Sequence, residues 1–283
     1  MITTHSMKHK LSILAFIPAL FVATNSNTEA QESKTVSSSE AVVSSDSARE
    51  LVMQSIAAHG GKDKWYNNGL LQFRWKYHLV DKGPDVIIDT TQTLNTKTLA
   101  IKHEVTNKEI TFGMNNGDVW ISPKGASFNP HPRFWSLTPI YFLGIPFIFN
   151  DDGANFELLK EPMNFEGKSY SQVKITFDSD AGDSPDDYYV LLIDPSTKLT
   201  KGTYYIVTSK LRAPSTGPGP AKFLSLDNLK DVNGVLLASG HRTFKMEDGK
   251  ITNQMRYTEI SGVKYVPSGS VDLSVPSKEL IIK

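Results

Sequence analysis

The sequence contains no cysteine. The chain therefore has no disulfide bond, no thiol nucleophile and no cysteine that could carry a lipid anchor. An excess of one charge is also missing, because 30 lysines and arginines balance 30 aspartates and glutamates. Nucleic-acid binding normally requires a basic patch, so we expect no nucleic-acid partner. For the same reason we expect no polybasic membrane tether.

Long apolar runs are missing too. A transmembrane helix needs about 20 apolar residues, whereas the runs at residues 11–23 and 134–149 are shorter. The first run follows a short basic start and precedes a polar stretch, which is the layout of a secretory signal peptide. We predict a signal peptide over residues 1–30, cleaved after Ala30 or alternatively after Ala23. The mature chain is then periplasmic or secreted, with no transmembrane span.

The next segment is rich in serine. Residues 31–45 hold few large apolar side chains and are typical of a flexible linker. Residues 46–283 remain, which is within the about 200–250 residues that one all-β domain reaches. Ser47 and Glu50 have the spacing of a capping box, and they predict an amphipathic helix over residues 48–58.

From residue 71 onward, apolar and polar residues alternate. Leu71, Phe73 and Trp75 predict a strand with one dry and one wet face. Turn residues separate further predicted strands at residues 86–94, 98–103, 109–114, 118–122, 156–160, 173–177, 188–193, 199–209, 223–229, 234–241, 242–246, 251–260 and 271–275. Because short connections make neighbouring strands antiparallel, we predict a mainly β fold with an N-terminal helix. The curved antiparallel meander is either an open half-barrel, which we favour, or a closed barrel.

The apolar run at residues 134–149 interrupts this meander and contains no charged residue. Pro139, Gly144 and Pro146 disfavour a continuous helix there. An exposed apolar patch of this size is rare unless it is functional, so we predict that the run covers the concave face of the sheet. It is then either a plug that fills the interior or a lid over a cavity for an apolar guest. The sequence does not separate these two alternatives.

Residues for catalysis or metal binding are few and scattered. Ser171 and Lys174 have S-x-x-K spacing, but a strand places them on opposite faces. The acidic segment 178–187 lacks the pattern of an EF-hand, and we interpret it as a solvated loop. His59 ends the predicted helix, and we interpret it as a histidine favoured by the helix dipole. We therefore expect no catalytic residue, no metal and no cofactor.

Five short motifs follow one another in a specific order. They are AHGG (58–61), IPFIFNDDG (145–153), GDSPDDYY (182–189), LLIDPST (191–197) and NGVLLASG (233–240). With them the chain resembles a family of uncharacterised secreted bacterial proteins that is similar in shape to the lipoprotein-carrier (LolA/LolB-like) superfamily. The resemblance implies a half-barrel, capped by helices, that holds acyl chains. We assign the latch arginine of those carriers to no position of this chain.

Taken together, these features predict a non-catalytic periplasmic carrier or binding protein for a lipid or other hydrophobic ligand. One alternative is an envelope protein–protein interaction module that uses the 134–149 segment. A hydrolase is the other. The expected ligand-binding residues are Phe134, Trp135, Ile140, Tyr141, Phe142, Ile145, Phe147 and Phe149 from the apolar run, with Phe73 and Trp75 from the sheet.

Overall fold

The computed structural model describes residues 38–150, 153–179, 186–208 and 219–282, so the predicted signal peptide lies outside the described residues. The helices are α1 (Ser38–Ala58), α2 (Lys62–Asn67) and α3 (Pro132–Leu143), with 3-10 turns η1 (Val80–Lys82), η2 (Phe147–Asn150) and η3 (Lys278–Leu280). The strands are β1 (Leu70–Leu79), β2 (Val86–Asn95), β3 (Ile101–Val105), β4 (Thr111–Asn115), β5 (Asp118–Ser122), β6 (Ala154–Phe165), β7 (Lys168–Phe177), β8 (Tyr189–Ile193), β9 (Thr200–Tyr205), β10 (Lys222–Val232), β11 (Val235–Glu247) and β12 (Lys250–Val266).

These 12 strands form one sheet in the order β5-β4-β3-β2-β1-β12-β11-β10-β9-β8-β7-β6. Every neighbouring pair is antiparallel, including the β1–β12 pair that joins the two ends of the meander. Strands β5 and β6 are the two edges, and no ladder joins them within the described ranges. The predicted mainly β half-barrel is therefore confirmed, and the closed barrel is wrong.

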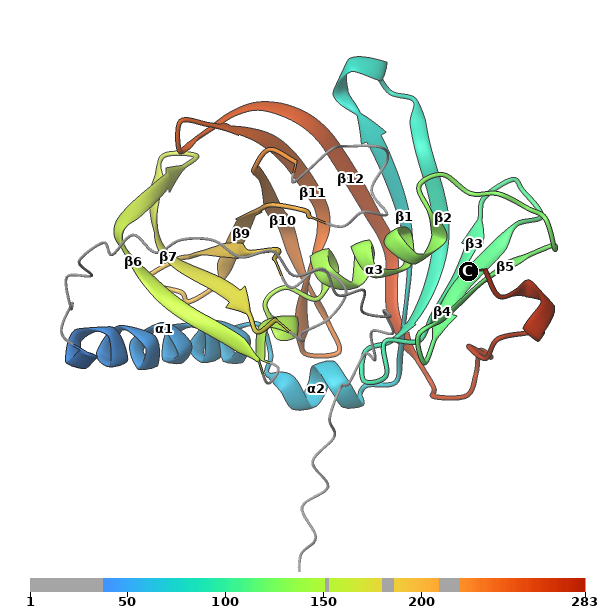
Figure 1. Ribbon diagram of the computed structural model, residues 1–283, viewed down its shortest axis with the longest axis horizontal. Coiled ribbons are helices and arrows are strands. Elements are labelled where there is room, and N and C mark those ends of the chain that lie inside the picture. The colour runs from blue at the N-terminus through green and yellow to red at the C-terminus, as the bar shows by residue number, and fades with distance from the viewer. Residues whose placement is uncertain (1–37, 151–152, 180–185, 209–218, 283) are drawn as a thin grey trace, which may run out of the picture.

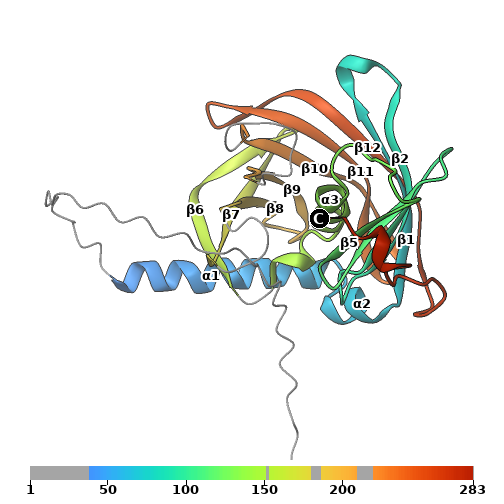
Figure 2. The ribbon, with the colours of Figure 1, turned by 45° about the vertical axis from the view of Figure 1, so that its right-hand side comes forward.

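The sheet curls around α3, while α1 lies along one rim beside β6 and β7 (Figures 1 and 2). The alternation predicted for the first strand places Leu71, Phe73 and Trp75 on the concave face, each at most 1% exposed. Arg74 points to the convex face, where it forms an ion pair with Asp89 at 2.6 Å. In the part of the chain that the structure describes, no helix is long and apolar enough to cross a membrane.

Helix α1 begins at Ser38, so the prediction that it starts at the capping box is wrong. Residues 38–45 of the predicted linker belong to the helix because they contain neither glycine nor proline to stop it. Ser47 is consequently an interior helical residue. The predicted apolar face is present, since Ala48, Val52 and Ile56 are at most 2% exposed.

Helix α1 ends where two of the sequence motifs meet. Gly60 has a φ of +112°, and a Cβ there would lie 2.0 Å from the carbonyl oxygen of Gly234. Leu236 donates its backbone N–H to the carbonyl of His59 at 2.8 Å. The AHGG motif therefore contacts the NGVLLASG motif at the β10–β11 turn, which explains why only glycine suits position 60.

Two strand predictions are wrong. The predicted strands 234–241 and 242–246 form the single strand β11, because no turn residue separates His241 from Arg242. Residues 271–275 form no strand; instead, Leu273 packs against Leu70 and Ala100 on the convex face. A few residues later the chain covers the edge of β5, where Ile281 forms a bridge with Trp120.

Candidate ligand-binding interior

The apolar run 134–149 consists of two different structures. Its first part belongs to α3, where His131 is the N-cap and accepts the N–H of Arg133 at 3.2 Å. Proline is well suited to the first helical position, which Pro132 occupies. The prediction that Pro139 disfavours a helix is wrong, because Pro139 lies inside α3 and is itself buried. Its apolar packing offsets the hydrogen bond that proline removes.

Gly144 ends α3, as predicted, and joins it to η2. A Cβ at position 144 would lie 2.6 Å from the carbonyl oxygen of Ile140 and 2.6 Å from Cγ2 of Ile148. The joint is therefore tight, and a larger residue would push α3 and η2 apart.

The η2 part is a plug. Ile145, Phe147 and Phe149 are at most 2% exposed. Phe147 stacks on Trp65 of α2 with ring centroids 4.9 Å apart and planes 6° apart. Phe149 packs on Tyr189 of β8 at 5.0 Å. Each aromatic ring thus contacts a ring from a different part of the fold.

The α3 part is buried on one side only. Trp135 and Ile140 face the interior, at 4% and 2% exposure. Tyr141 and Phe142 are only partly buried, although Phe142 contacts Tyr205 at 5.2 Å between ring centroids. Phe134 is partly buried as well and does not belong to the main apolar core. Of the ten expected ligand-binding residues, all others belong to that core or pack against it.

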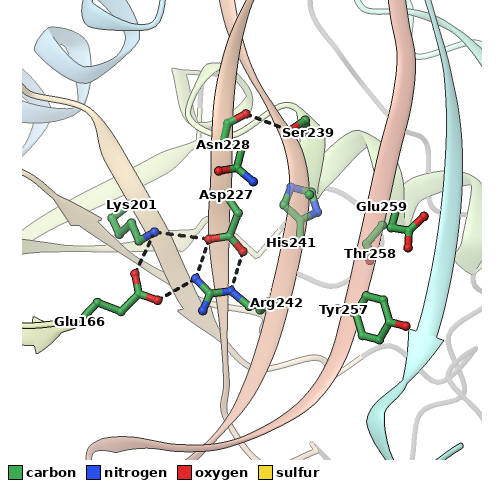
Figure 3. A pocket seen from close by; sticks show the side chains of 11 residues that line it. Glu166, Lys201, Asp227, Asn228, Ser239, His241, Arg242, Tyr257, Thr258 and Glu259 are labelled. Carbon is green, nitrogen blue, oxygen red and sulfur yellow. Dashed lines mark hydrogen bonds and ion pairs between the residues drawn. The ribbon is translucent and has the colours of Figure 1, made fainter. Parts of the chain in front are cut away.

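Two hollows stand out on the surface, and the apolar run lines neither. One, of about 370 Å³, lies beside the C-terminal segment near Leu273. The other, of about 470 Å³, lies on the convex face of β10, β11 and β12 (Figure 3). The buried side chains of the run, such as Trp135, Phe147 and Phe149, belong instead to the main apolar core.

The convex hollow is lined by a network of four charges. Arg242 donates from Nε and Nη2 to the carboxylate of Asp227, each at 2.8 Å, and contacts Glu166 at 2.8 Å. Lys201 contacts both acids at 3.3 Å. Burial raises the pKa of Asp227, but the hydrogen bonds from Arg242 and Ser225 and the positive charges of Arg242 and Lys201 together outweigh it, so the pKa is lowered overall. The network fastens the β6–β7 turn, which carries Glu166, to the outside of the sheet (Figure 3).

His241 also lines this hollow, but its ring packs against aromatic rings of the interior. The ring centroids are 5.3 Å apart for Trp75 and 6.4 Å apart for Phe142. Trp75 and Phe142 belong to the concave side, whereas the carboxylates of Glu166 and Asp227 are held on the convex side by Lys201 and Arg242. The third carboxylate of the hollow, that of Glu259, contacts Lys76 and His78. The histidine and the acids are therefore not arranged as a catalytic pair. No group of three histidine, aspartate or glutamate residues that could hold a metal is present in the described ranges.

Three histidines are buried in the apolar interior, and burial lowers the pKa of each. The pKa of His103 falls to about 3 and that of His241 to about 4. His59 donates its Nδ1–H to the carbonyl oxygen of Ser55, 2.9 Å away, and burial lowers the pKa of His59 despite that hydrogen bond. The interpretation of His59 as a charged residue favoured by the helix dipole is therefore wrong, because loss of hydration dominates.

The other candidate residues from the sequence take part in a strand, an ion pair and hydrogen bonds. Ser171 and Lys174 lie in β7, as predicted, and Lys174 contacts Glu157 at 3.9 Å. Most of the acidic segment 178–187 lies outside the described residues. Its last member, Asp187, accepts the N–H and the hydroxyl of Thr208 at 2.6 and 2.7 Å.

Sequence analysis missed a row of polar residues beneath α3. The register pairs Tyr77 of β1 with Thr258 of β12, and Thr258 with His241 of β11. Helix α3 crosses this row, because Trp135 contacts Tyr77 at 5.5 Å and Phe142 contacts His241 at 6.4 Å. The alternation of β1 places Tyr77 on the concave face, but its neighbours follow only from the register.

No protein-family model matches the chain, and no curated protein matches it in sequence. Among solved structures it is similar to a LolA superfamily protein from Nitrosomonas europaea, with 9% identity over 77% of this chain and 93% of that one and a TM-score of 0.48. It is similar to a DUF1329 family protein from Desulfovibrio piger, with 11% identity, 80% and 95% coverage and a TM-score of 0.46. A putative outer membrane lipoprotein-sorting protein domain from Vibrio parahaemolyticus gives 11% identity, 80% and 94% coverage and a TM-score of 0.46. These are likenesses of fold.

Proposed function

We propose that the chain is a non-catalytic periplasmic or secreted carrier, or binding protein, for a lipid or other hydrophobic ligand. The observation that carries this proposal is the difference between α3 and η2. Helix α3 covers an apolar interior with one side and is only partly covered on the other, whereas Phe147 and Phe149 of η2 are almost completely buried. Helix α3 moves away from the sheet about the Gly144 joint, and η2 stays in place.

The free energy lost when α3 leaves the sheet is close to the free energy gained when a ligand takes its place. Lifting α3 exposes Trp135, Ile140 and Leu143, which are buried in the closed state. Re-exposing one large apolar side chain costs about 1.5–3 kcal/mol. An acyl chain that covers the same sheet surface recovers a comparable area, so the ligand replaces the helix as the cover of the interior.

A reversible cross-link tests this proposal. Because the chain has no native cysteine, the reagent reacts only with the cysteines that are introduced. We would change Phe142 and Tyr205, whose rings are 5.2 Å apart, to cysteine and join them with a cleavable bis-maleimide. Uptake of a fluorescent fatty acid is expected to disappear on cross-linking and to return on cleavage. The control is the same treatment of Arg74→Cys with Asp89→Cys on the convex face. Unchanged uptake in the cross-linked protein would contradict a moving lid.

Native mass spectrometry of protein purified from the periplasm is the second test. A bound apolar molecule is expected to co-purify. The proposal is wrong when no molecule co-purifies and no fluorescent fatty acid is taken up.

A second candidate function is docking of an envelope protein. The β1–β2 hairpin projects beyond the rest of the sheet (Figure 1), and its tip exposes Val80, Val86 and Ile87 by 42–46%. These exposed side chains offer an apolar contact surface. Loss of a cross-linked partner in Val86→Asp or Ile87→Asp, with the fold intact and fatty-acid uptake unchanged, would favour docking over carriage.

A further inference from the structure

Arg256 lies on the concave face near the rim of the interior. It is paired in register with Leu79, the last residue of β1, and with Thr243 of β11. It is two residues from Thr258 on β12, and alternate residues of a strand share a face. Arg256 is therefore on the same side of the sheet as Tyr77, and its positive charge acts on the Tyr77 hydroxyl.

Arg256 has no anionic partner in the part of the chain that the structure describes. Its Nε atom is buried and has no hydrogen-bond acceptor, and no carboxylate pairs with it anywhere in the described ranges. By contrast, Arg74 and Arg242 on the convex face are paired with Asp89 and Asp227. Burying part of a charged group without a partner costs free energy, so the position is suited to receiving an anion.

The neighbours of Arg256 supply further polar contacts. His241 has two ring nitrogens without a partner, and its burial keeps the ring neutral, so one nitrogen is a donor. The Tyr77 ring lies under Trp135 of α3. Beyond these residues the concave face is apolar, with Phe73 and Trp75 on the same strand as Tyr77. A polar rim therefore adjoins an apolar interior.

We propose that Arg256, with Tyr77 and His241, binds the acidic head group of an amphiphile whose apolar chain lies beneath α3. This inference rests on the proposed function and names its ligand class. The guanidinium offers charge-assisted hydrogen bonds to a carboxylate or a phosphate, and the fork of donors suits both. Because Arg256 is at the rim, the head group stays near solvent while the chain enters the interior.

Three ligands of equal chain length test the inference: palmitate, hexadecyl phosphate and the uncharged methyl palmitate. Binding is followed by tryptophan fluorescence, since Trp75 and Trp135 lie along the expected path. Arg256→Gln is expected to weaken binding of the acidic ligands about 10- to 100-fold, the worth of a hydrogen bond to a charged group, and to leave methyl palmitate unchanged. The acid that binds more tightly to the native protein identifies the head group.

Lys264→Gln is the matched control, because it removes one positive charge from the same strand on the convex face. It should leave the affinity for all three ligands unchanged. Tyr77→Phe provides a second variant in case Arg256→Gln does not fold. It is expected to weaken the binding of the acidic ligands about fivefold.

The outcomes separate this inference from the proposed function. If the native protein binds all three ligands and Arg256→Gln affects them equally or not at all, the head-group site is wrong and carriage stands. If the native protein binds none of the three, the proposed function fails, and the head-group site fails with it.

Discussion

The two parts of the apolar run are alike in composition and different in structure. Around η2, Phe147 and Phe149 stack on aromatic rings of α2 and β8 and are almost completely buried. On α3, Phe134 and Phe142 remain partly exposed. The difference shows that a single apolar segment can supply both a fixed part of the core and a cover that lies above it. Whether the two parts act independently can be tested by changing each in turn.

The largest effect is expected from Phe147→Ala. The side chain is fully buried and stacked on Trp65, so its removal leaves a cavity at the centre of the core. The free energy of unfolding should fall by about 3–5 kcal/mol in denaturant titrations. A loss below about 1 kcal/mol would mean that η2 is not anchored in the way its contacts indicate.

A smaller effect concerns His241 beneath α3. Its folded pKa is about 4, lowered by burial, whereas the unfolded value is 6.5. Between these two pH values the unfolded chain binds more protons than the folded chain. The contribution of His241 to the free energy of unfolding is therefore fully present above pH 6.5 and decreases as the pH falls toward 4. His103 acts in the same direction down to about pH 3.

The measurement is the unfolding free energy of the native protein and of His241→Gln from pH 7 to pH 4. We expect the native protein to lose roughly 2–3 kcal/mol more than the variant over this interval. Carboxylates titrate in both proteins and therefore cancel in the difference. Parallel curves would show that His241 is already accessible to protons in the folded state.

The smallest effect on stability is expected from Phe142→Ala. The side chain is only partly buried, so the unfolding free energy should fall by about 1–2 kcal/mol, well below the cost at Phe147. Loosening α3 should at the same time speed the uptake of fluorescent fatty acid in stopped-flow measurements. Equal losses at Phe142 and Phe147 would remove the distinction between lid and plug.

Local patterns determined a large part of this fold. The period of two at Leu71, Phe73 and Trp75 predicted both the first strand and its buried face, because side chains alternate across any strand. The glycines after His59 ended the first helix, and the uncharged run 134–149 was identified as the cover of the interior. These features depend on residues close together in the chain.

Other features were decided only by the tertiary structure. Helix α3 continues through Pro139 because packing against the sheet offsets a lost hydrogen bond. His241 and Arg256 reach the interior beside Tyr77 because β1 pairs with β12, far away in the sequence, and β12 pairs with β11. No local pattern encodes that pairing, since strand register depends on the burial of whole faces at once. The sequence by itself therefore determined where the apolar cover lies, and only the fold decided which polar groups lie beneath it.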